Sequence, residues 1–274
     1  MYSYTRFTVP TLFAFLLLAA SPLASTVSSS VPTEPKAVLQ DDELPDKRPE
    51  VKELCEKLGD HAKMRGKEDR EAIETVDSLL QDFENCGPKD RALVVKTLSA
   101  CLKQKRKEVE DGVYDNKLFL AAAVGLGEMA PESVKPLIDW IGNKKHRRNL
   151  DLQRRLIRSL GKTKDPKGIK TLDDTLRHHE DSLVGAAAEA LGEYTELELS
   201  KRKKIFKTML SILMGAKSLV DGDSADIRAR ERYDVIAAPI ITSLQRLSGQ
   251  DETVPENWER WWNKNKKKDW DKAN

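Results

Sequence analysis

One spacing recurs three times in the middle of this chain and restricts its fold more than any other feature. In each case a leucine lies nine residues before a glycine, and a second leucine directly precedes that glycine. The three segments are Leu118–Gly127, Leu152–Gly161 and Leu183–Gly192. Their glycines lie 34 and 31 residues apart, a period that is typical of stacked units of two helices. The spacing therefore predicts an array of similar helix pairs.

The hydrophobic residues inside each unit follow a helical period. Leu152, Leu156 and Leu160 recur every four residues, which predicts one apolar stripe on a helix. We expect Asp151 to supply an N-cap acceptor for this helix, and Asp181 or Ser182 to do so in the next unit. We also expect the glycine that ends each segment to close its helix in the left-handed conformation. A second apolar stripe follows a proline-containing turn, as in Ile169, Leu172 and Leu176.

Residues 115–192 resemble HEAT repeats, including the HEAT-like units related to phycobilisome lyases. They show an aspartate, a helix rich in small residues such as Ala186-Ala187-Ala188, a Leu-Gly pair, a turn and a second apolar helix. An arginine often follows the capping aspartate in that family, whereas Gln153 and Gly185 stand in this region here. The resemblance implies an all-α fold, an α-solenoid of HEAT-like antiparallel helix pairs. The usual work of such solenoids is to bind other macromolecules.

We expect the array to span residues 50–274. Apolar stripes predict further helices over 51–58, 72–83 and 93–102 before the repeat, and over 205–213 and 225–247 after it. Near the C-terminus, Trp258, Trp261 and Trp262 lie at i, i+3 and i+4, on one face of a short helix. We interpret them as a structural cap that seals the last repeat. An aromatic platform that binds carbohydrate or peptide is the alternative.

The first 49 residues differ in composition from the rest. Residues 1–26 contain one charge, Arg6, an apolar run over 12–20 and small residues near Ala24, the layout of a secretory signal peptide. The run is about half the roughly 20 residues that span a bilayer, so we expect no membrane span once the signal is removed. Residues 27–49 are rich in serine, proline and acids, which predicts a flexible linker. The protein is therefore predicted to be exported, either to the periplasm or outside the cell.

Charge is nearly balanced overall but not locally. The chain has 47 Lys and Arg against 45 Asp and Glu, and the resulting net charge of +2 disfavours binding of nucleic acid through bulk charge. Aromatic residues make up only 6%, which disfavours a β-sandwich or barrel. Two basic clusters are candidate partner-binding sites: Lys144, Lys145, Arg147, Arg148, Arg154, Arg155 and Arg158, and then Lys201, Arg202, Lys203 and Lys204. Further clusters occur at Lys103–Lys107 and Lys264–Lys268.

In a stacked array, turns that are distant in sequence align along one edge, so these clusters can form one basic strip. Such a strip would bind a protein partner with an acidic or otherwise anionic surface. The alternative is an ordinary solvated surface that nearby carboxylates neutralise.

The sequence shows no pattern of catalytic residues and implies no cofactor. It contains no nucleophile elbow, phosphate-binding loop or zinc-protease motif. The adjacent His178-His179 is poorly placed to chelate one metal, because neighbouring helical residues point about 100° apart. The segment Asp221–Asp226 is similar to a calcium loop but lacks its glycine and its final glutamate, so we interpret it as a helix cap. Cys55, Cys86 and Cys101 are either buried thiols or include one disulfide.

These observations predict an exported HEAT-like repeat protein that acts as a non-catalytic scaffold or adaptor for protein-protein interaction. Two alternatives remain. One is an enzyme similar to a phycobilisome lyase, and the other is a regulatory subunit of an exported enzyme.

Overall fold

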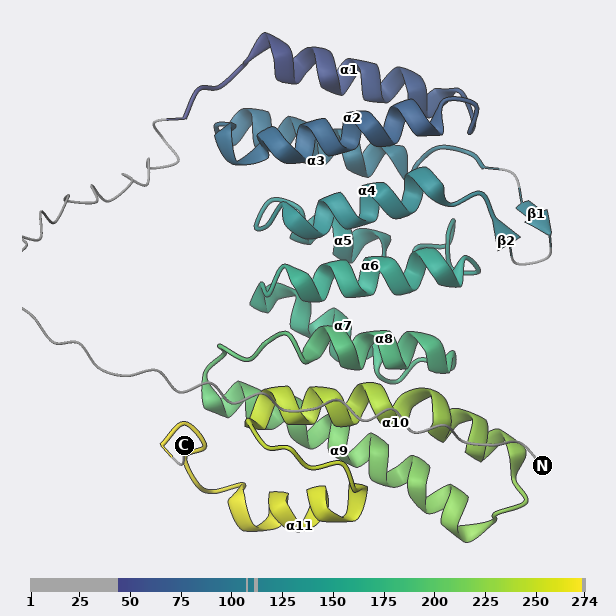
Figure 1. Ribbon diagram of the computed structural model, residues 1–274, viewed down its shortest axis with the longest axis vertical. Coiled ribbons are helices and arrows are strands. Elements are labelled where there is room, and N and C mark those ends of the chain that lie inside the picture. Colours follow the sequence, from purple (N-terminus) through teal and green to yellow (C-terminus); the bar gives the residue numbers. More distant parts are fainter. Residues whose placement is uncertain (1–43, 107, 111–112, 273–274) are drawn as a thin grey trace, which may run out of the picture. The chain divides into compact units, whose positions relative to one another are not determined.

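Nearly all of the regular secondary structure in the described part of the chain is helical. The structure is a computed structural model that describes residues 44–106, 108–110 and 113–272. The predicted signal peptide and residues 27–43 of the predicted linker lie outside these ranges. The prediction of an all-α fold is confirmed (Figure 1). The α-helices are α1 (Pro49–Lys63), α2 (Asp69–Asp82), α3 (Pro88–Cys101), α4 (Lys117–Glu128), α5 (Val134–Trp140), α6 (Leu150–Lys162), α7 (Ile169–Thr175), α8 (Asp181–Leu191), α9 (Leu199–Gly222), α10 (Ile227–Ser248) and α11 (Pro255–Asn265).

Short elements join some of these helices. The 3-10 helices η2 (Phe83–Asn85) and η3 (Pro166–Gly168) follow α2 and precede α7. Between α3 and α4, strands β1 (Glu108–Glu110) and β2 (Val113–Tyr114) pair antiparallel, with Glu108 opposite Tyr114. This small hairpin is a feature that the hydrophobic pattern did not predict.

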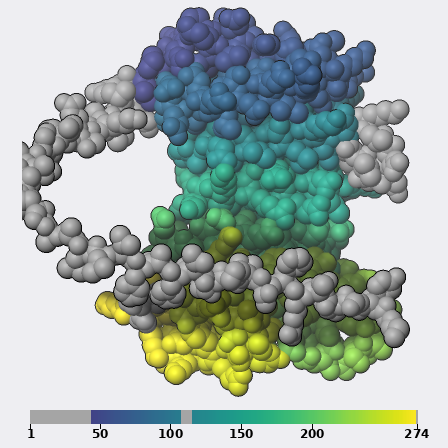
Figure 2. Space-filling model, in the orientation of Figure 1, coloured from purple at the N-terminus to yellow at the C-terminus, as the bar shows by residue number. Residues whose placement is uncertain are grey.

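The even-numbered helices form a continuous row. Helix α2 packs on α4, α4 on α6, α6 on α8 and α8 on α10 (Figure 1). Each also packs against an odd-numbered neighbour, as in α1–α2, α3–α4, α5–α6, α7–α8 and α9–α10. Side chains fill the space between successive helices from α1 to α8 (Figure 2). The apolar stripe predicted for residues 152–160 faces this core, where Leu152, Leu156 and Leu160 are fully buried.

The repeated glycines serve close packing between helices instead of helix closure. Gly127 and Gly161 lie inside α4 and α6, and Gly192, which follows α8, has a φ of −65°. The expectation of a left-handed conformation is therefore wrong. A Cβ on Gly161 would lie 2.5 Å from the Cα of Ala190, and one on Gly192 would lie 2.5 Å from the Oγ of Ser243. Each glycine is required because the next helix of the row approaches the backbone at that point.

The helix caps also differ from the prediction. The side chain of Asn149 caps α6 by accepting a hydrogen bond from the Leu152 N–H, and Asp151 lies within the first turn. Asp181 is the first residue of α8, where it forms ion pairs with Arg228 and Arg232 of α10. Asp226 caps α10 by accepting from the Ala229 N–H, 3.0 Å away, as the acidic segment 221–226 predicts.

The described end of the predicted linker is bound to the helical array. Asp90, a buried residue of α3, accepts hydrogen bonds from the Lys47 and Arg48 N–H groups at 3.0 and 2.9 Å. Asp46 in turn accepts a hydrogen bond from the Lys89 N–H at 2.8 Å. Residues 44–48 are therefore held at the start of α3, and α1 begins at Pro49.

All three cysteines are free and buried, so the buried-thiol interpretation is confirmed. Burial raises the pKa of Cys86 to about 11 and that of Cys101 to about 12, and it also raises the pKa of Cys55. The thiols are therefore protonated and inert at neutral pH. Within the described ranges, no helix has both the length and the apolar composition that a membrane crossing needs.

Candidate functional site

The turn between α5 and α6, residues 141–149, carries the first four candidate residues and is held by buried polar contacts. His146 donates a hydrogen bond from Nε2 to the Leu102 carbonyl at 2.7 Å. Its ring also packs edge-on against Phe119, with ring centroids 5.1 Å apart. Burial lowers the pKa of His146, which keeps the imidazole neutral in this contact. The turn is thereby fixed to the end of α3.

A pair of buried amides holds the other end of the same turn. Asn149 and Asn116 exchange two hydrogen bonds through their side chains, at 2.6 and 3.0 Å. Gln153, which is 1% exposed, accepts a hydrogen bond from the Gly142 N–H at 2.8 Å and donates one to the Trp140 carbonyl at 3.3 Å. These three amides anchor the backbone, so the charged side chains between them project from a fixed support.

The cations of this turn continue onto a neighbouring segment. Lys145 donates from Nζ to the carbonyls of Lys103 and Gln104. Burial lowers the pKa of Lys145, and the charges of Lys105 and Arg106 lower it further. Two of the basic clusters predicted from the sequence therefore meet here. We call this surface the basic edge and define it by Lys103, Lys105, Lys144, Lys145, Arg147 and Arg148.

Beside the basic edge lies a cavity of about 540 Å³, between the α5–α6 turn and the start of α8. Its apolar wall is formed by Ile141, Leu150, Ile157 and Leu183. Arg147 and Arg148 line it, both are exposed, and their guanidinium groups have no hydrogen-bond or ion-pair partner among the described residues. We call it the edge cavity. It combines an apolar interior with two free guanidinium groups, a combination that suits an anionic group attached to an apolar one.

The adjacent histidines also line the edge cavity, a position that the sequence did not indicate. His178 and His179 stack with their ring centroids 4.3 Å apart. The Nδ1 of His178 accepts a hydrogen bond from the Glu180 N–H at 3.0 Å, and burial together with the neighbouring His179 lowers the pKa of His178. Turns at the ends of α5 and α7 thus contribute to one site, because the two helix pairs stack with these turns side by side.

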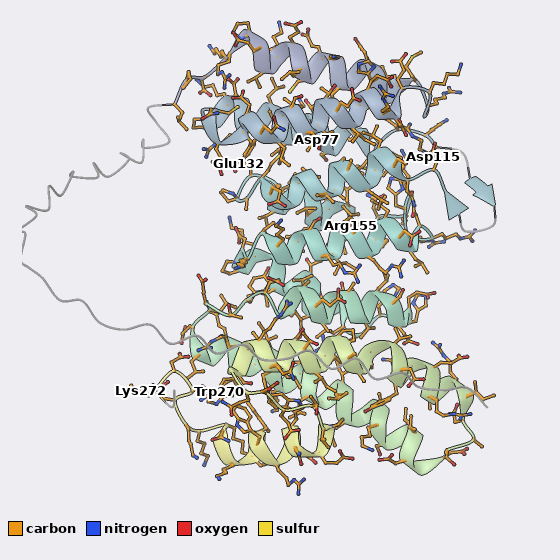
Figure 3. All side chains as sticks on the ribbon, in the orientation of Figure 1. Asp77, Asp115, Glu132, Arg155, Trp270 and Lys272 are labelled. Atoms are coloured by element: carbon orange, nitrogen blue, oxygen red, sulfur yellow. The ribbon has the colours of Figure 1, made fainter. Side chains whose placement is uncertain are left out.

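The remaining arginines of the first cluster have different surroundings. Arg154 pairs with Asp151 on the same helix, and Arg158 pairs with Glu189 of α8. Arg155 is exposed on α6 and has no partner among the described residues (Figure 3). Arg158 also borders a second cavity, of about 640 Å³, between α6, α8 and α10, where charged side chains are paired with each other. Local ion pairs therefore satisfy Arg154 and Arg158.

The second predicted cluster lies at the opposite end of the helices. Lys201 and Lys204 border a cavity of about 360 Å³ with Pro166 and Ile169, near the end of α6. Ile169, at the start of α7, borders this cavity, whereas Thr175, at the end of α7, borders the edge cavity. Lys201 and Lys204 thus border a different cavity from Arg147 and Arg148, and a single basic strip stays a prediction.

Two members of the second cluster take part in packing. Arg202 is 8% exposed, donates to the Leu247 carbonyl at 3.2 Å and pairs with Asp271. Lys203 donates to the Lys268 carbonyl at 2.6 Å and lies over the ring of Trp270, 5.4 Å from its centroid. These contacts fix the C-terminal residues on α9.

The tryptophans of α11 surround Phe206 of α9. The rings of Trp258, Trp261 and Trp262 have their centroids 5.6, 5.5 and 5.4 Å from that of Phe206. Trp258 is fully buried, and the other two are half-buried. Trp270, which the sequence pattern did not single out, joins the same cluster at 5.3 Å (Figure 3). The three side chains that the i, i+3, i+4 spacing places on one face of α11 therefore pack on α9, and their role as a cap of the last repeat stays a prediction.

Among the described residues, no three His, Cys, Asp or Glu side chains are grouped so that they could hold a metal ion. In the acidic segment 221–226, Asp221 pairs with Lys217, and Asp223 and Asp226 accept backbone N–H groups. Comparison of the chain with protein-family models, with curated proteins and with solved structures gives no match.

Proposed function

We propose that this protein is an exported, HEAT-like α-solenoid that serves as a non-catalytic scaffold for protein-protein interaction. The basic edge and the edge cavity form its binding surface, and the partner presents an acidic surface with an apolar side chain. The helix pairs and the continuous even-numbered row support the solenoid part of this proposal. The spacing of the Leu-Gly segments supports the assignment to HEAT-like repeats.

One observation carries the binding part of the proposal. Arg147 and Arg148 line a cavity with an apolar wall and have no partner among the described residues. Most other candidate cations are satisfied by carboxylates or carbonyls, as Arg154, Arg158 and Arg202 are. A guanidinium group that lacks an internal partner and is held on a fixed turn is arranged to pair with a carboxylate from outside.

The test is cross-linking in the native cell envelope followed by mass spectrometry. We expect the wild-type chain to capture one stoichiometric protein partner, and the double variant Arg147→Glu/Arg148→Glu to lose that capture. The matched control is Lys57→Glu/Lys96→Glu, which changes the net charge equally at two exposed lysines of α1 and α3 that have no partner among the described residues. Equal capture by the double variant and the wild type would refute the assignment of the binding surface.

Export is tested separately, by determining the N-terminus of the protein recovered from cells. We expect the mature chain to begin close to residue 27, after the small residues that follow the apolar run. Recovery of the chain with residues 1–26 intact from the cytoplasm would remove this part of the proposal.

A further inference from the structure

The last hairpin, α9–α10, extends past the hairpins that precede it. Helices α9 and α10 have 24 and 22 residues, whereas α6 and α8 have 13 and 11. Gly192, one residue past the 11 residues of α8, lies against Ser243, the seventeenth residue of α10, and Asp181 at the start of α8 pairs with both Arg228 and Arg232. The first five residues of α10 therefore reach about 8 Å beyond the start of α8 (Figure 1). We call residues 219–227, where α9 ends and α10 begins, the hairpin tip.

The hairpin tip is both apolar and acidic. Leu219 and Ile227 are 59% and 63% exposed, more than any other large hydrophobic side chain in the described part of the chain. Between them lie Asp221, Asp223 and Asp226, all exposed. Asp223 and Asp226 have no cationic partner among the described residues. Two exposed aliphatic side chains beside carboxylates are a pattern of a contact surface.

The edge cavity is complementary to the hairpin tip in both respects. Its apolar wall can receive an aliphatic side chain, and its volume of about 540 Å³ exceeds that of a leucine or an isoleucine. Its free cations, Arg147 and Arg148, match the free carboxylates of Asp223 and Asp226. The tip cannot reach this cavity in its own chain, because α10 is fixed to α8 by the ion pairs of Asp181 and by the contact of Ser243 with Gly192.

We infer that the hairpin tip of one copy docks into the edge cavity of a second copy. Ile227 and Leu219 enter against the apolar wall, and the tip carboxylates pair with Arg147 and Arg148. This inference rests on the proposed function, since it takes the basic edge as a protein-binding surface and names its partner as this same chain.

The positions of the two surfaces favour a closed dimer. The edge cavity lies at the start of α6 and α8, and the hairpin tip lies at the start of α10. Helices α6, α8 and α10 run in the same direction, because the late residues Gly161 and Ala190, and Gly192 and Ser243, are in contact. Both surfaces are therefore on one edge of the row. A two-fold axis through that edge brings each tip to the other cavity, and a symmetric pair buries both contacts at once.

The experiment is sedimentation velocity on the full chain over a range of concentrations, at low and at high salt. The wild-type chain is expected to form a dimer that weakens as salt rises, because free charges are paired across its interface. The cavity variant Arg147→Glu/Arg148→Glu and the tip variant Asp221→Lys/Asp223→Lys are each expected to raise the dimer dissociation constant at least tenfold. Neither change removes the Asp226 cap or a buried side chain, and circular dichroism verifies that each variant is folded.

Mixing the two variants gives the decisive measurement. In the mixed pair, the lysines of the tip variant face the glutamates of the cavity variant, and the second contact is wild type on both sides. Two variants that are monomeric alone should therefore form a heterodimer, detected by energy transfer between donor and acceptor labels. The variant Lys57→Glu/Lys96→Glu should dimerise like the wild type and should not rescue the tip variant.

A wild-type chain that stays monomeric at every concentration would overturn the inference, and so would a mixture that stays monomeric. These results differ from failure of the proposed function. If the chain is monomeric but Arg147 and Arg148 are still needed to cross-link a different protein, the basic edge is a binding surface for that protein. If the chain is monomeric and cross-linking does not depend on Arg147 and Arg148, both proposals are refuted.

Discussion

The helices in the middle of the even-numbered row and those of the last hairpin are all α-helices, but they differ in how closely other helices approach their backbones. At the C-terminal ends of α4, α6 and α8, the next helix contacts the backbone at a glycine. These glycines are Gly127, Gly161 and Gly192. In α9, Gly215 and Gly222 have no atom within 4 Å of the place where a Cβ would lie, and the hairpin tip is exposed. Packing against neighbours on both sides restricts the middle helices, whereas Leu219 and Ile227 of the tip remain exposed in the described part of the chain.

The other end of the last hairpin packs against α11. Removing that contact should have the largest effect on stability. Trp258→Ala deletes a fully buried ring beside Phe206, so we expect a loss of about 3–5 kcal/mol in the free energy of unfolding. Trp258→Phe should cost clearly less, because the indole N–H has no hydrogen-bond partner among the described residues. Chemical denaturation measures both, and a near-neutral Trp258→Ala would show that α11 does not stabilise α9.

The next prediction compares two glycines directly. In Gly161→Ala the new Cβ would meet the Cα and carbonyl oxygen of Ala190 at 2.5 and 2.8 Å, so α6 and α8 must separate, at a cost of about 1–3 kcal/mol. Gly215→Ala meets nothing within 4 Å and should stabilise the protein by up to about 1 kcal/mol, because alanine favours the helix. Urea unfolding of the two variants should shift in opposite directions. Equal shifts would contradict the difference between the two regions.

The smallest expected effect concerns the turns. The turn at 141–149 is tied down by the neutral His146, whose pKa burial lowers below the ordinary imidazole value of about 6.5. The unfolded chain then binds a proton more readily than the folded one, so this contribution is complete above pH 6.5 and is lost as the pH falls below it. His146→Gln retains a donor for the Leu102 carbonyl but does not titrate.

Thermal unfolding of the wild type and of His146→Gln between pH 8 and pH 5 measures this contribution. The wild type should lose stability below pH 6.5 more steeply than the variant. Burial also lowers the pKa of His178, which contributes equally to both proteins and cancels in the difference. Parallel pH profiles would show that protonation of His146 does not disturb the turn.

Periodicity predicted the helices well because each one buries a single stripe, as Leu152, Leu156 and Leu160 show. It could not assign the role of the glycines, since closing a helix and admitting a neighbour both require the absence of a side chain. Only the contacts of Gly161 with Ala190 and of Gly192 with Ser243 distinguish the two roles.

The candidate site was predicted in part, for a related reason. The sequence identified Arg147 and Arg148 together with Lys201 and Lys204 as candidates, but the first two border one cavity and the last two border another. A cluster of charged residues in the sequence shows where cations are concentrated. Which side chains each cation meets in the fold depends on which turns stack together. His178 lines the edge cavity because of that stacking. Arg202 is not available to a partner, because its guanidinium group binds Asp271 and the Leu247 carbonyl.

The glycine contacts also determine how this array could change by duplication or by engineering. Each glycine fits one particular small residue on the following helix: Gly127 fits Ser159, Gly161 fits Ala190 and Gly192 fits Ser243. A helix pair is therefore not a free-standing module, because half of each contact belongs to the unit that follows. An inserted helix pair would need a glycine that faces a small residue of the next unit. It would also need a small residue that faces the glycine of the previous unit. The order of the units therefore depends on matched pairs of small residues that lie about 30 to 50 positions apart in the sequence.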